Sequence, residues 1–70
     1  MNDIARNFKT ARRKSGMTQE QAALKLGCSF HSINRWENGR ACPSFNDAIQ
    51  LSILYDVPLD ELAYGETRDF

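Results

Sequence analysis

The 70-residue sequence has little that would anchor it in a membrane or cross-link it. No apolar run approaches the roughly 20 residues that span a bilayer. The chain begins with the charged, amphipathic stretch MNDIARNFKTARRKSG, which does not resemble an export signal. Its two cysteines, Cys28 and Cys42, lack the C-x-x-C spacing of a redox or zinc pair. We therefore expect a cytoplasmic protein that folds without a disulfide.

The usual residues of catalysis are also scarce. His31 is the single histidine, no pair of carboxylates lies near it, and no glycine-rich loop is present to cradle a phosphate. The three soft ligands Cys28, His31 and Cys42 match no zinc motif. Cys28 also falls at an inward apolar position, where a free cysteine behaves as a small hydrophobe. We expect no enzyme, no bound metal and no cofactor.

The net charge is zero, yet the charges are unevenly distributed. Residues 1–40 carry eight basic and three acidic side chains, whereas residues 41–70 carry one basic and six acidic side chains. This separation fits a molecule that presents one face to phosphate and another to solvent or a partner. The alternative is an ordinary solvated surface whose charges segregate by chance.

Residues 18–27 have the pattern of a short helix with both ends marked. Thr18 is a good N-cap, and Gln21 three residues later completes a capping box. Gly27 ends the helix, because glycine adopts a left-handed turn without steric cost. Small and apolar side chains form its inward face, namely Ala22, Ala23 and Leu26.

A second short helix follows at once. Ser29 caps it, Ile33 and Trp36 supply its buried face, and Asn38-Gly39 stops it. Two such helices joined by a three-to-four-residue turn make a helix-turn-helix, whose second helix is suited to the DNA major groove.

Three more helices complete an all-α prediction without strands. The first runs from about Asp3 to Ser15 and ends at Gly16. Its expected inward residues are Ile4, Phe8 and Ala11. Residues 1–64 are expected to form a single domain, and residues 65–70 a frayed tail.

The fourth helix is expected to start at Ser44, with Asp47 completing a second capping box. Its predicted inward face consists of Phe45, Ala48, Ile49, Ser52 and Tyr55. Val57 and Leu59 lead into a short fifth helix, in which Leu62 closes the core.

These residues resemble the helix-turn-helix domain of the lambda/434 repressor and Cro type, the XRE family. The resemblance covers roughly nine-tenths of the chain, as one domain. It is carried by Ile4, Phe8, Ala11-Arg12, Met17-Thr18-Gln19, Trp36-Glu37-Asn38-Gly39-Arg40, Pro43-Ser44-Phe45 and the stretch Val57-Pro58-Leu59-Asp60-Glu61-Leu62. It implies a compact five-helix lambda-repressor-like fold and a DNA-binding regulator of transcription.

Arg35 is the first candidate for reading a base. It lies two residues after inward-facing Ile33, so it points outward, where a bidentate contact to guanine is the commonest specific contact. The alternative is a phosphate contact or a solvated charge. Phe30 and His31 lie in the first turn, closest to base edges. We expect His31 to donate or accept a hydrogen bond near a base. For Phe30 two alternatives are open: it touches thymine methyl groups, or it folds back over Trp36 or its own cap.

Seven further side chains are candidates for contacts with the DNA backbone. The resemblance assigns such a contact to Gln19 and to Asn38, although Asn38 with Gly39 also fits a purely structural C-cap. The whole set is Gln19, Lys25, Ser29, Ser32, Asn34, Asn38 and Arg40.

The resemblance implies a structural role for Arg12 and Glu37. In the XRE family the matching arginine and glutamate form a partly buried ion pair that ties the first helix to the third. A bidentate, charge-assisted pair suits such a clamp, and removing one partner strands the other charge. We therefore assign both residues to structure and not to DNA contacts.

Leu24 and Ile53 stand where relatives usually have polar residues, and helical spacing directs both outward. They are candidates for contact with another subunit or a protein partner, although single exposed aliphatic residues are also ordinary. Asp56 replaces a glycine common at the end of the fourth helix, and aspartate tolerates a left-handed turn less well.

The sequence therefore predicts a sequence-specific regulator of transcription, and a repressor in particular. It is expected to bind two-fold symmetric, operator-like double-stranded DNA as a homodimer. Two alternatives remain open: an antitoxin-like regulator that also holds a protein partner, and a protein-interaction module that kept the fold and lost its DNA affinity.

Overall fold

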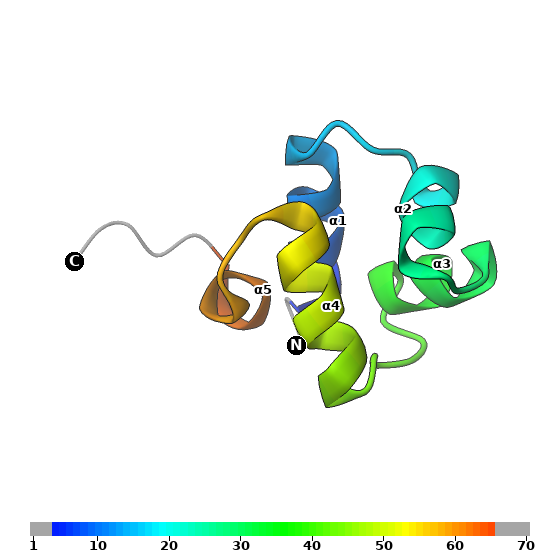
Figure 1. Ribbon diagram of the computed structural model, residues 1–70. Coiled ribbons are helices and arrows are strands. Elements are labelled where there is room, and N and C mark those ends of the chain that lie inside the picture. The colour runs from blue at the N-terminus through cyan, green and yellow to red at the C-terminus, as the bar shows by residue number, and fades with distance from the viewer. Residues whose placement is uncertain (1–3, 66–70) are drawn as a thin grey trace.

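The computed structural model describes residues 4–65, which form five helices and no strand. The helices are α1 (Ile4–Lys14), α2 (Gln19–Leu26), α3 (Phe30–Glu37), α4 (Phe45–Tyr55) and α5 (Leu59–Tyr64) (Figure 1). The all-α, five-helix prediction is confirmed. Asp3 and most of the tail predicted at 65–70 lie outside the described residues, and α1 ends one residue before Ser15. Each helix within 4–65 is too short or too polar to span a bilayer.

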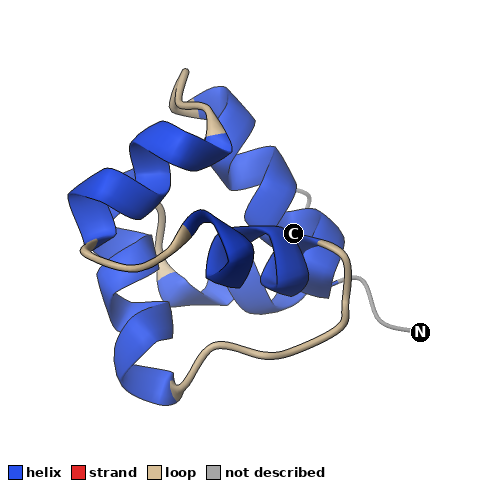
Figure 2. Cartoon of the chain, turned by 90° about the vertical axis from the view of Figure 1, so that its right-hand side faces the viewer, coloured by secondary structure: helices blue, strands red, loops and turns tan. Residues whose placement is uncertain are grey.

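The α2–α3 pair packs on one side of α1 and α4, and α5 packs on the other (Figure 1). The view from the α2–α3 side shows the helices joined by loops, with no strand within residues 4–65 (Figure 2). Every helix contributes to one core, which consists of Phe8, Ala11, Ala22, Ala23, Ile33, Trp36, Leu51, Tyr55 and Leu62. This core holds α3 by its inner face and leaves the outer face of α3 to solvent.

The predicted capping at both ends of α2 is confirmed. Thr18 Oγ1 accepts a hydrogen bond from the Gln21 backbone N–H at 3.0 Å, and Gln21 Oε1 accepts one from the Thr18 N–H at 2.9 Å. Gly27 ends α2 in the left-handed conformation, with φ of 77°. Because both helix ends are satisfied locally, the short turn to α3 has a defined geometry.

The predicted inward face of α4 is partly wrong. Phe45 is 75% exposed, whereas Leu51, absent from the prediction, is only 1% exposed. Leu51 and Tyr55, one turn apart, form the buried stripe. Helix α4 carries apolar residues around most of its circumference, so its sequence periodicity does not select one face.

Two smaller predictions, the capping box of α4 and the burial of Ile4, are wrong. Ser44 Oγ accepts from the Asp47 N–H at 3.1 Å, but the return bond of a capping box is absent. The aspartate side chain is one carbon shorter than the glutamate that usually reaches back. Ile4, expected in the core, is 37% exposed because it opens α1 at the edge of the molecule.

Candidate nucleic-acid interface

Helix α3 exposes all three residues predicted to read bases, with His31 and Arg35 on its outer face and Phe30, 37% exposed, in its first turn. Ser29 caps α3 by accepting a hydrogen bond from the Ser32 N–H at 3.3 Å. Ile33 and Trp36 are buried, and Phe30, His31 and Arg35 are exposed. His31 and Arg35 are four residues apart, so they share one side of the helix. The α3 packing therefore brings these side chains to one surface.

The Phe30 ring contacts the ring of His31. Their centroids are 5.6 Å apart and the planes are inclined at 65°, an edge-to-face arrangement. Such aromatic pairs are favourable beyond the area they bury. This contact leaves the Phe30 ring partly exposed at the start of α3.

The seven candidates for backbone contacts surround this face. Lys25, Ser29, Asn38 and Arg40 are exposed, and Gln19, Ser32 and Asn34 are half-buried. Asn38 is also the C-cap of α3, and its backbone N–H donates to the Asn34 carbonyl at 3.1 Å. DNA contact by these seven side chains stays a prediction.

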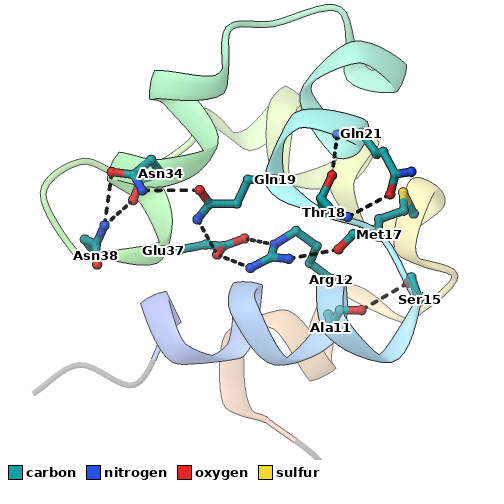
Figure 3. A network of polar contacts seen from close by, with 10 residues as sticks. All are labelled: Ala11, Arg12, Ser15, Met17, Thr18, Gln19, Gln21, Asn34, Glu37 and Asn38. Carbon is teal, nitrogen blue, oxygen red and sulfur yellow. Dashed lines mark hydrogen bonds and ion pairs between the residues drawn. The ribbon is translucent and has the colours of Figure 1, made fainter.

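Three carboxamides in this region are joined by hydrogen bonds (Figure 3). Gln19 Nε2 donates to Glu37 Oε1 at 3.0 Å, and Asn34 Nδ2 donates to Gln19 Oε1 at 3.3 Å. Asn38 Nδ2 donates to Asn34 Oδ1 at 3.2 Å and to the Asn34 carbonyl at 2.9 Å. The sequence alone does not predict these hydrogen bonds, because the contact between Gln19 and Asn34 depends on how α2 crosses α3.

Beneath this network, Arg12 and Glu37 form a buried ion pair. Arg12 Nε lies 2.7 Å from Glu37 Oε2, and Arg12 Nη2 lies 2.9 Å from Glu37 Oε1. The third guanidinium nitrogen, Nη1, donates to the Met17 carbonyl at 2.8 Å. The hydrogen bond with Glu37 raises the pKa of Arg12. The pair thus joins α1, the loop before α2, and α3.

Leu24 is 82% exposed and Ile53 is 67% exposed, as helical spacing predicted. Asp56 ends α4 with φ of 57°, in the left-handed region. Cys28 packs against the core, and burial, with a smaller contribution from Asp47, raises the pKa of its thiol. No group of three His, Cys, Asp or Glu residues within 4–65 is placed to hold a metal ion.

The capped α2, the turn at Gly27 and the outward face of α3 together define a helix-turn-helix protein. A family model described as helix-turn-helix matches residues 8–62. The chain belongs to the XRE family of helix-turn-helix transcriptional regulators, as its resemblance indicated. Members of this family are regulators that bind DNA and are not enzymes, so the prediction of a non-enzyme is confirmed.

Three curated relatives support this assignment. The chain is 32% identical over 66 residues to the uncharacterized HTH-type transcriptional regulator YqaE of Bacillus subtilis (strain 168), with 94% of this chain and 57% of YqaE aligned. It is 34% identical over 59 residues to the HTH-type transcriptional regulator ImmR of the same organism, which covers 84% of this chain and 46% of ImmR. It is 38% identical over 50 residues to the HTH-type transcriptional activator BcrR of Enterococcus faecalis, which covers 71% of this chain and 24% of BcrR. The chain thus spans about half the length of the two Bacillus relatives.

Proposed function

We propose that this protein regulates transcription by binding a specific double-stranded DNA site through α3. The observation that carries the proposal is the outer face of α3, where Phe30, His31 and Arg35 are exposed together. Ile33 and Trp36 fix the opposite face in the core, so α3 enters a groove as part of a rigid domain. In a helix-turn-helix, the first residues of the second helix approach the base edges.

The three exposed side chains offer complementary chemistry. Arg35 donates two parallel hydrogen bonds to O6 and N7 of guanine, which no other base pair accepts in the same geometry. His31 has one donor and one acceptor nitrogen in its neutral form. Phe30 offers an apolar edge to the thymine methyl group. This face therefore reads a short stretch of sequence.

The charges orient the domain on DNA. Lys25, Arg35 and Arg40 lie on or beside the α2–α3 pair and are exposed. Within the described residues, the acidic side chains of the second half lie on α4, α5 and their connection, namely Asp47, Asp56, Asp60 and Glu61. DNA phosphates attract the basic end of the domain and repel its acidic end, which favours an approach with α3 toward the DNA.

The active form is a homodimer on two-fold symmetric DNA. A single domain offers few cations to phosphate, and a second copy doubles the contacts and adds selectivity for half-site spacing. A dimer that makes about six phosphate contacts loses affinity about a thousandfold between 50 and 200 mM salt. By occupying such a site in the cytoplasm, the dimer represses transcription by blocking polymerase.

A protein-interaction module is the second candidate function. The observation that favours it is the exposure of Leu24 and Ile53, two aliphatic side chains at positions where solvent favours polar ones. This function needs no DNA contact from α3.

Selection from a random duplex library at physiological salt tests the proposal. Wild-type protein should enrich two half-sites about one helical turn apart, and a promoter carrying that motif should lose activity when the protein is expressed. If the protein instead activates that promoter, its mechanism is recruitment of polymerase and not repression. A library that is not enriched over input would refute DNA reading and favour the interaction module.

A further inference from the structure

The network of Glu37, Gln19, Asn34 and Asn38 has a defined direction. A carboxamide has the same shape when its oxygen and nitrogen are exchanged, so only the chemistry of its neighbours sets its orientation. Glu37 is buried and paired with Arg12, and its carboxylate accepts hydrogen bonds only. Gln19 must therefore turn its nitrogen, and not its oxygen, toward Glu37 Oε1.

This first orientation fixes that of Asn34, whereas Asn38 is oriented by both the side-chain oxygen and the backbone carbonyl of Asn34. With its nitrogen on Glu37, Gln19 offers only its oxygen to Asn34, which must present Nδ2. Asn34 then offers Oδ1 to Asn38, which must present its own Nδ2. Reversing any one carboxamide would oppose two oxygens or two N–H groups. The charge of the buried ion pair thus determines, through hydrogen bonds, the orientation of these side-chain amides.

Gln19 is held at both ends of its carboxamide. Its nitrogen is bound to Glu37 and its oxygen to Asn34, which leaves the second N–H of Nε2 unused by this network. The residue is half-buried at the first position of α2, beside the α3 reading face. A side chain of this length loses rotamer entropy when it binds in one geometry, and here that loss already occurs in the free protein.

We propose that Asn34 is a positioning residue for DNA binding, which holds the Gln19 carboxamide so that its second N–H meets a phosphate oxygen. Asn34 acts through Gln19, and the buried Glu37 sets the direction. The inference rests on the proposed function, because it requires that α3 lies on DNA. Preorganisation of one such side chain strengthens binding about threefold to tenfold.

A double-mutant cycle tests the inference on the DNA site found by selection. Asn34→Ala should weaken binding about threefold to tenfold, and Gln19→Ala at least as much. In the Gln19→Ala background, Asn34→Ala should change the dissociation constant less than twofold, because Asn34 acts through the residue already removed. The salt slope should stay unchanged in the Asn34→Ala and Gln19→Ala variants, because an amide releases no counterions.

Asn34→Ala combined with Lys25→Ala is the control cycle, in which the losses should multiply. Thermal melting of each variant establishes that it is folded, and Asn34→Ser replaces Asn34→Ala if the latter lowers the midpoint by more than a few degrees. An NMR spectrum of the free protein gives a second readout. The Gln19 side-chain amide protons should show nuclear Overhauser cross-peaks to Asn34, and these cross-peaks should disappear in Asn34→Ala.

The outcomes separate this inference from the proposed function. If the wild-type protein binds DNA but the affinity losses of Asn34→Ala and Gln19→Ala multiply in the double variant, Asn34 makes an independent contact. That result would overturn the positioning role alone. A Gln19 amide that shows no contact with Asn34 would overturn it as well. Wild-type protein that binds no DNA would overturn both proposals.

Discussion

Arg12 and Glu37 are 25 residues apart in the sequence and share two hydrogen bonds, of 2.7 and 2.9 Å, across the interface between α1 and α3. Both side chains are almost fully buried. Each charge is compensated within the protein, and Glu37 also accepts the Gln19 amide. The pair therefore has two effects, on the free energy of unfolding and on the surface amides above it.

Glu37→Ala should lower the thermal midpoint by more than about 10 °C. The substitution leaves a buried guanidinium without its partner, which costs about 3–5 kcal/mol. In a domain of this size, each kcal/mol corresponds to about 4–8 °C in the midpoint. Melting followed by circular dichroism measures the shift. Glu20→Ala, at an exposed position of α2, is the matched control, and an unchanged midpoint for Glu37→Ala would contradict a stabilising pair.

Arg35→Ala should weaken DNA binding and relax selectivity at one base position. Loss of a bidentate guanine contact costs about 1–3 kcal/mol. Lys25→Ala should instead weaken binding evenly across sequences and reduce the salt slope by about one. Titration of the selected duplex and its single-base variants measures both. An Arg35→Ala protein with wild-type selectivity would exclude base reading by Arg35.

Ala23→Leu should destabilise the fold, because Ala23 is buried in the core on α2, which packs against α3 and α4. Extra methylene groups in a packed core cost about 1–3 kcal/mol. Urea denaturation measures the difference. The adjacent substitution Leu24→Ala, on the solvent side, should change stability by less than about 0.5 kcal/mol. If both substitutions changed the free energy of unfolding equally, Ala23 would not lie in a tightly packed site.

Asp56→Gly should stabilise the protein. Asp56 has φ of 57°, a conformation that glycine adopts without strain, and its carboxylate lies at the C-terminal end of α4, where negative charge is unfavourable. We expect a gain of about 0.5–1 kcal/mol. Asp56→Asn retains the side chain and removes the charge, so it separates the two contributions in the same denaturation experiment. A decrease in stability with glycine would count against backbone strain.

The stability of the protein should decline at alkaline pH through Tyr55. Burial, assisted by the charge of Glu37, raises the pKa of Tyr55 to about 12. The unfolded phenol titrates near pH 10, so between pH 10 and 12 the folded state binds more protons than the unfolded state. This contribution, about 2–3 kcal/mol, is complete below pH 10 and is lost as the pH rises to 12.

Denaturation at pH 9 and pH 11.5 measures the Tyr55 effect, with Tyr55→Phe as the control. The free energy of unfolding of the wild-type protein should fall more between pH 9 and pH 11.5 than that of Tyr55→Phe, since phenylalanine does not ionise. Parallel pH profiles would show that Tyr55 does not cause the decline.

Local sequence chemistry was sufficient for the helices and their ends. Thr18 with Gln21, Gly27 and Ser29 form their caps from residues a few positions away, so the pattern predicts them without the rest of the fold. The exposure of Arg35 followed in the same way, from its spacing relative to Ile33, whereas spacing alone left the orientation of Phe30 open. The pairing of Arg12 with Glu37 was expected only from the family resemblance.

Only the tertiary structure decided which side of α4 is buried and which polar groups meet. Apolar residues lie all around α4, so packing against α2, α1 and α5 selects Leu51 and leaves Phe45 exposed. The hydrogen bond between Gln19 and Asn34 likewise depends on the crossing of α2 and α3. Caps depend on neighbours along the chain, which the sequence specifies directly, whereas these contacts depend on the rotation and approach of whole helices, which are set by the packing of the entire core.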